Sequence, residues 1–162
     1  MPKTTNPTTT CLKSNLQKAL ALVGRAVAKN STLPILTNVL LSAEGGRLRL
    51  SATNLELSLT TYIGCKSTGD WRMTLPFQTL SDYVAALPDD TVTLECNASK
   101  STVKATCQAY TSTFKGLAAE DFPTLPAVDK PAFSLDGQDI TIAIKRVIGA
   151  AATDEARPVL TG

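Results

Sequence analysis

The 162-residue chain contains no histidine, and this absence excludes more chemistry than any residue present suggests. Without an imidazole there is no Ser-His-Asp triad, no Cys-His pair and no His-ligated metal within these residues. The phosphate-binding patterns GxGxxG and GxxxxGK[ST] are also missing. Most common hydrolase mechanisms are therefore excluded, and we expect no cofactor, no metal and no catalytic residue.

Cysteine and long apolar runs are also scarce. The four cysteines form no CxxC pair, so we expect small buried or half-buried thiols rather than disulfides. No apolar run approaches the roughly 18 residues of a membrane span, and the N-terminus lacks the apolar core of a secretory signal. The sequence predicts a cytoplasmic protein with no membrane partner, and 43% hydrophobic and 19% charged residues indicate a globular one.

The first part of the chain has a mixed α and β pattern. Residues 8–13 are β-prone, and Ser14 has the position of a helix N-cap before an apolar-periodic stretch that runs to about Ala28. Three β-prone runs follow, predicting an antiparallel meander with a turn at Gly45-Gly46. A second helix is predicted after RMTLP, ending at Pro88, and further short strands come after it. This pattern is typical of an α+β domain.

Residues 119–131 carry three prolines and no periodicity, which is typical of a linker. After this stretch the first helical pattern begins again at an offset of 124 residues, measured from Pro34 to Pro158. Apolar positions coincide in the two copies: Leu16 with Ile140, Ala19 with Ala143, Leu20 with Ile144, Val23 with Val147 and Ala26 with Ala150.

The repeat predicts the domain organisation. We expect a flexible N-terminal extension at 1–7, a first domain at 8–125, a linker at 126–131, and the truncated start of a second domain at 132–162. We also expect residues beyond Gly162, because the second copy stops as its strand begins.

Positive charge is concentrated at the start of the chain. Residues 1–43 contain five basic residues and no acidic one. On a continuous helix, Lys18, Arg25 and Lys29 would lie within about 20° of one another, opposite the apolar stripe. One side of the predicted helix would then pack against a hydrophobic core, and the opposite, basic side could bind an anion. A few cations on a solvated face usually serve solubility, however, and a net charge of +2 argues against a bulk electrostatic grip on nucleic acid.

The segment KNSTLPILTNVLLSAEGGRLRLSATNLELSLTT closely resembles the signature of the beta subunit of bacterial DNA polymerase III, the sliding clamp. LPDD, GLAAEDFPTLP and DEARPVLTG are similar to further clamp segments in the same order. The chain departs from the family at Asn54, where aspartate is usual, and in the leading MPKTTN.

The resemblance implies a clamp-type α+β domain with antiparallel sheets on the outside and two helices on the DNA-facing side, followed by a truncated second copy. It implies a ring-forming homodimer that encircles double-stranded DNA without sequence preference and acts as a processivity factor. The implied partners are the replicative DNA polymerase, the clamp loader and other clamp-binding peptides.

The resemblance also implies three sets of site residues. The DNA-facing residues would be Lys18, Arg25, Lys29, Asn30, Lys145 and Arg146. The edge strand that pairs with the partner subunit would contain Ala109, Thr111, Thr113 and Lys115. Part of the partner-peptide pocket would be lined by Arg157, Val159 and Leu160, with Leu160 alternatively a core residue.

Two other functions are compatible with parts of the sequence. One is a stand-alone α+β module that binds a peptide or a nucleic acid, which native mass would distinguish from a clamp. The other is an enzyme that uses Asp82, Glu120 and Asp121, but these carboxylates form no motif that such chemistry requires.

Overall fold

A computed structural model describes residues 6–29, 31–125, 133–154 and 157–161. The chain divides into two compact units, Met1–Leu125 and Pro126–Gly162. Within the described residues, no helix is both long enough and apolar enough to cross a bilayer.

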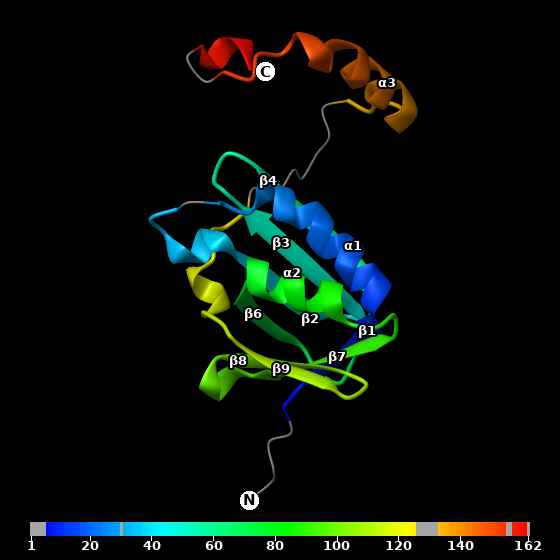
Figure 1. Ribbon diagram of the computed structural model, residues 1–162, viewed down its shortest axis with the longest axis vertical. Coiled ribbons are helices and arrows are strands. Elements are labelled where there is room, and N and C mark those ends of the chain that lie inside the picture. The colour runs from blue at the N-terminus through cyan, green and yellow to red at the C-terminus, as the bar shows by residue number, and fades with distance from the viewer. Residues whose placement is uncertain (1–5, 30, 126–132, 155–156, 162) are drawn as a thin grey trace, which may run out of the picture. The chain divides into compact units, whose positions relative to one another are not determined.

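The first unit contains two antiparallel sheets (Figure 1). The five-stranded sheet has the order β5-β1-β7-β8-β9, formed by Lys66–Ser67 (β5), Thr8–Leu12 (β1), Thr91–Asn97 (β7), Thr102–Cys107 (β8) and Tyr110–Lys115 (β9). The four-stranded sheet has the order β4-β3-β2-β6, formed by Ser58–Gly64 (β4), Arg47–Thr53 (β3), Asn38–Glu44 (β2) and Trp71–Pro76 (β6). The predicted meander is confirmed, because β2 pairs with β3 and β3 with β4.

Two α-helices complete the first unit, α1 at Lys13–Val23 and α2 at Phe77–Ala86. They pack against each other, and α1 also packs against β3 and β4 (Figure 1). Short 3-10 turns follow or connect these elements at Gly24–Ala26 (η1), Pro34–Thr37 (η2), Ala98–Lys100 (η3) and Ala119–Asp121 (η4).

One hydrophobic core joins both sheets and both helices. Alternate strand residues point into it, because successive side chains of a strand lie on opposite faces. Its fully buried members include Leu16, Leu20, Val23, Val39, Leu41, Leu48, Leu50, Leu75, Leu80, Val84, Val92, Leu94 and Val103. Each such side chain contributes on the order of 1.5–3 kcal/mol relative to an exposed one.

The predicted ends of the first helix are wrong. The helix begins at Lys13, and its N-cap residue is Leu12 without a side-chain cap, so Ser14 lies inside the helix. It ends at Val23 rather than near Ala28. The ring of Phe77 lies against the next residue, Gly24, so closely that a Cβ there would collide with it. The chain then tightens into η1 and becomes extended.

The proline-rich segment is not a linker along its whole length. Phe122 is buried and packs with Leu40 and Ala119 in a small second cluster, so the segment to Leu125 covers part of the four-stranded sheet. Residues 126–132 lie outside the described residues.

At the N-terminal end of the first unit, the side-chain amide of Asn6 donates a hydrogen bond to Glu95, 2.8 Å. The carbonyl of Pro7 accepts one from the Cys96 N–H, 3.0 Å. These two residues of the expected extension are therefore held on β7, while residues 1–5 lie outside the description.

The second unit repeats the beginning of the first. It contains a helix at Gly137–Val147 (α3) and 3-10 turns at Ile148–Ala150 (η5) and Pro158–Leu160 (η6). Each starts 124 residues after its counterpart α1, η1 or η2, as from 13 to 137. The hydrogen bonds repeat as well, because the Ala28 N–H donates to the Leu36 carbonyl at 3.1 Å and the Ala152 N–H to the Leu160 carbonyl at 2.8 Å. The sequence repeat is therefore a repeat of backbone structure.

The two copies differ in what covers their apolar stripe. Ile144 of α3 is 50% exposed, whereas its counterpart Leu20 is 1% exposed. Ile140 and Val147 of the same helix are also exposed. The helix itself is capped, because the side chain of Asp136 accepts hydrogen bonds from two backbone N–H groups. The second unit thus presents a helix face that the first unit buries.

Candidate nucleic-acid interface

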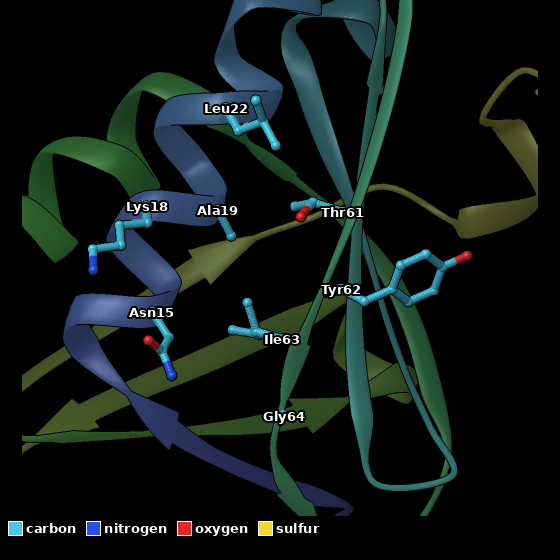
Figure 2. Close-up of a pocket in the computed structure, with 8 residues that line it drawn as sticks. All are labelled: Asn15, Lys18, Ala19, Leu22, Thr61, Tyr62, Ile63 and Gly64. Carbon is cyan, nitrogen blue, oxygen red and sulfur yellow. The ribbon is translucent and has the colours of Figure 1, made fainter. Parts of the chain in front are cut away.

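Lys18 projects from the middle of α1 into solvent. Figure 2 shows it pointing away from β4, while Ala19 on the same helix faces Ile63. A shallow hollow of about 410 Å³ lies between α1 and β4, lined in part by Asn15 and Lys18. The core side of α1 is thus occupied by the sheet, and its opposite side is available to a ligand.

The predicted single helix face for Lys18, Arg25 and Lys29 is wrong. That geometry required a continuous helix to residue 29, but Arg25 lies in η1 and Lys29 follows the extended residue Val27. All three side chains are nevertheless exposed. They form a series of separate cations along α1 and the segment after it.

The structure brings Lys29 close to a residue that sequence reasoning missed, Gln78. Both line a hollow of about 400 Å³ together with Gly24 and Phe77. Gln78 lies in the first turn of α2, which has no side-chain cap, so backbone N–H groups and the positive end of the helix dipole lie nearby. The sequence did contain a signal for Gln78, because it is the second residue of the predicted second helix and so lies at the helix N-terminus.

The other expected DNA-facing residues are placed in different ways. Asn30 lies outside the described residues. Lys145 and Arg146 lie in the last turn of α3 and are exposed, in positions that match Ala21 and Leu22 of α1. Basic residues there also interact favourably with the helix dipole.

The expected edge strand is an edge of the five-stranded sheet. Within the described residues β9 pairs along one side only, with β8. Thr111, Thr113 and Lys115 are exposed, whereas Phe114 is buried, its ring edge-on to Tyr83 with centroids 5.5 Å apart. Ala109 is not in the strand: it lies in the turn after Gln108, which has a positive φ of 51°.

The expected peptide-pocket residues lie in and beside η6. Val159 is 86% exposed and Leu160 is 52% exposed, and Arg157 is exposed as well. The counterpart of Leu160 in the first copy, Leu36, is 4% exposed. The repeat therefore favours the core alternative for Leu160, and the pocket stays a prediction.

Comparison with known proteins decides the family. The sequence profile of the DNA polymerase III beta subunit, N-terminal domain, matches residues 8–126. The chain belongs to this family. It is 35% identical over 156 residues to the beta sliding clamp of Synechococcus elongatus, covering 94% of this chain and 41% of that protein. It is 36% identical over 161 residues to the beta sliding clamp of Synechocystis sp., with the same coverage.

The fold of this clamp-family chain is confirmed by solved structures. The DNA polymerase sliding clamp from Caulobacter crescentus superimposes with a TM-score of 0.86 at 30% identity, covering 96% of this chain and 42% of that one. The chain spans about two fifths of the length of the curated relatives it matches. The predicted resemblance and the α+β fold class are therefore confirmed.

The departure from the family pattern at Asn54 has a structural explanation. Its side-chain oxygen accepts hydrogen bonds from the N–H groups of Glu56, 3.1 Å, and Leu57, 2.7 Å. These bonds hold a turn in which Leu55 has a φ of 77°. An amide oxygen and a carboxylate oxygen can both accept these bonds, so asparagine supports the turn that aspartate would form.

The surroundings of the four thiols and of the three candidate carboxylates are defined in the described residues. Burial, with a smaller contribution from neighbouring Cys65, raises the pKa of Cys11 to about 12, so the thiol stays protonated near neutral pH. All four cysteines are free, and only Cys65 is not buried, which confirms the prediction made for them. Asp82 accepts a hydrogen bond from Gln78, 2.8 Å, and Glu120 and Asp121 are exposed. In the part of the chain that the structure describes, no three His, Cys, Asp or Glu side chains are grouped to hold a metal ion.

Proposed function

We propose that this chain is the N-terminal part of a sliding clamp subunit that forms a ring around duplex DNA and tethers the replicative DNA polymerase. The observation that carries the proposal is the structural repeat, in which α1, η1 and η2 recur as α3, η5 and η6 at a constant offset. Tandem copies of one unit can build a curved ring, and the chain belongs to a family whose named members are sliding clamps.

The charge distribution supports topological rather than adhesive binding. Lys18, Arg25 and Lys29 are exposed on and after α1, while α2 carries no basic residue. Each exposed cation provides only a weak, salt-screened attraction to phosphate. A ring that encloses DNA needs no stronger contact, and it reads no base sequence. Its role is to hold the polymerase in place, and it catalyses no reaction.

Two further surfaces belong to the same proposal. The open edge of β9 can continue a sheet of a second subunit through backbone hydrogen bonds, giving a homodimer. Arg157, Val159 and Leu160 would contribute to a pocket for short peptides of the polymerase, the clamp loader and other partners. The protein would act on DNA in the cytoplasm.

The test uses the complete gene product, loaded with its clamp loader onto nicked circular plasmid that is then linearised. We expect the protein to stay on the circle and to leave the linear DNA, measured by gel filtration of labelled protein. Equal retention on both forms would refute enclosure of the DNA. Arg25→Gln is the control, because loss of one cation should leave retention on the circle nearly unchanged. Native mass separates this function from a stand-alone binding module.

A further inference from the structure

The four-stranded sheet has a second face, opposite α1, on which basic side chains gather. The register places Arg49 of β3 directly across from Ser42 of β2 and from Tyr62 of β4. On the same face, Arg47 lies across from Glu44. The neighbouring residues of these strands, such as Leu41, Leu48 and Ile63, pack in the core. Alternation along each strand therefore directs the five polar side chains away from the core.

These five residues line a hollow of about 190 Å³, which we name the outer-face hollow: Ser42, Glu44, Arg47, Arg49 and Tyr62. Figure 2 shows Tyr62 on the opposite side of β4 from Lys18 and Asn15. The outer-face hollow is therefore separate from the cations of α1. A volume of this size accepts a single side chain or a small ion rather than a nucleotide.

The outer-face hollow contains a buried hydrogen-bond donor without an acceptor among the described residues. Ser42 is 2% exposed and lines the outer-face hollow with its polar side chain. The Nε of Arg49 is shielded from solvent and, among the described residues, has no hydrogen-bond partner. Buried polar groups are normally paired, so the unpaired N–H donor of this half-buried arginine indicates a site for an acceptor.

The positive charge of this sheet face indicates that the acceptor is an anion. Within the described residues, no ion pair engages Arg47 or Arg49, and Glu44 can offset only one of the two guanidinium groups. Arg72 of β6, across from Ser42, adds a further positive charge. A guanidinium group binds a carboxylate through two parallel hydrogen bonds, and the exposed ring of Tyr62 beside it offers apolar contact. Arginine and tyrosine together are typical of protein interfaces.

We propose that the outer-face hollow binds a carboxylate side chain from an acidic peptide segment of a protein partner, with Arg49 as the main contact and Arg47 as the second. Ser42 donates a further hydrogen bond to the same carboxylate. The site faces away from α1, so it can be occupied whether or not DNA is bound, and it does not depend on the proposed clamp function.

The test measures binding of a fluorescein-labelled, end-blocked tetraglutamate peptide to the 162-residue chain by fluorescence anisotropy. We expect Arg49→Gln to weaken binding at least about tenfold, because a hydrogen-bonded charge partner is lost. Glu44→Gln should strengthen binding about two- to fivefold, because it removes a competing carboxylate. Lys100→Gln is the control: it removes one exposed positive charge at η3, beside the other sheet, and binding should be retained.

Three results would overturn the proposal. One is unchanged affinity in Arg49→Gln and Arg47→Gln variants whose Trp71 fluorescence shows a native fold. Another is equal binding of a tetraglutamine peptide. The third is binding of inorganic phosphate, at matched ionic strength, without binding of tetraglutamate, since this would indicate a site for a free anion. If Arg49→Gln fails to fold, exposed Arg47 and Glu44 still provide the test.

Discussion

The repeat allows one pair of substitutions to test the fold at equivalent positions. Leu20 in α1 and Ile144 in α3 occupy the same place in the two copies, but they are 1% and 50% exposed. Leu20→Ala removes three buried methyl(ene) groups from a core shared by both sheets, so it should lower the free energy of unfolding by about 2.7–5 kcal/mol. Ile144→Ala removes apolar atoms that are half in solvent, and its cost in this chain should be within about 0.5 kcal/mol.

Urea unfolding is a suitable assay because the chain has a single tryptophan. Trp71 is 6% exposed and its indole N–H donates a hydrogen bond to Thr9, 2.7 Å, so its fluorescence reports the core of the first unit. A loss of about 3 kcal/mol corresponds to a fall of about 1–3 M in the urea midpoint. Far-UV circular dichroism follows the Ile144→Ala variant, because α3 lies in the other unit. The reasoning would be refuted if Leu20→Ala left the midpoint unchanged, or if both substitutions were equally costly.

Two other substitutions and a pH series test local features. Gly24→Ala should destabilise the first unit by about 1–3 kcal/mol, because its Cβ meets the ring of Phe77, whereas Gly64→Ala, in open space in the same unit, should have little effect in the same urea assay. Hydrogen bonds to Asp90, the largest effect coming from Gln108, hold the pKa of this carboxyl below its ordinary value. Its stabilisation is thus present above the unfolded-state pKa of about 3.9 and is lost as the pH falls through the lower folded-state value. Thermal melts should show a smaller fall in Tm below about pH 4 for Asp90→Asn than for the unmodified chain, and identical pH profiles would contradict this.

Much of the fold could be predicted because local patterns agree with the tertiary structure. Alternation of apolar residues predicted β2, β3 and β4, and the repeat at an offset of 124 predicted a second copy of the first helix, found as α3. The close contact between Gly24 and the ring of Phe77 could not be predicted, because the two residues lie 53 positions apart in the chain. The same holds for Phe122, whose burial depends on meeting Leu40. Residues that meet only in the folded chain leave no periodic signal in their own segment.

The candidate sites show the same division between local and tertiary information. Exposed cations near α1 could be predicted, because a lysine such as Lys18 lies opposite the apolar stripe of its own helix. The association of Lys29 with Gln78 could not be, because it depends on the packing of α1 against α2. For Arg47 and Arg49 a signal existed in the RLRL alternation, which directs both arginines to one face. Their juxtaposition with Ser42 and Tyr62 required the strand register.

The two faces of the four-stranded sheet separate the two surfaces that we propose to bind anions. One face packs against α1, whose outer side carries Lys18, so the cations proposed to face DNA are separated from the sheet by a full layer of helix. The other face is covered near Leu40 by Phe122, and the outer-face hollow lies two residues further along β2, at Ser42. Over a helix and a sheet, about 10 Å each, screening at physiological salt reduces the interaction between these charges to a small value. Substitution of Arg49 should therefore leave the weak attraction between α1 and DNA unchanged, and substitution of Lys18 should leave binding at the outer-face hollow unchanged.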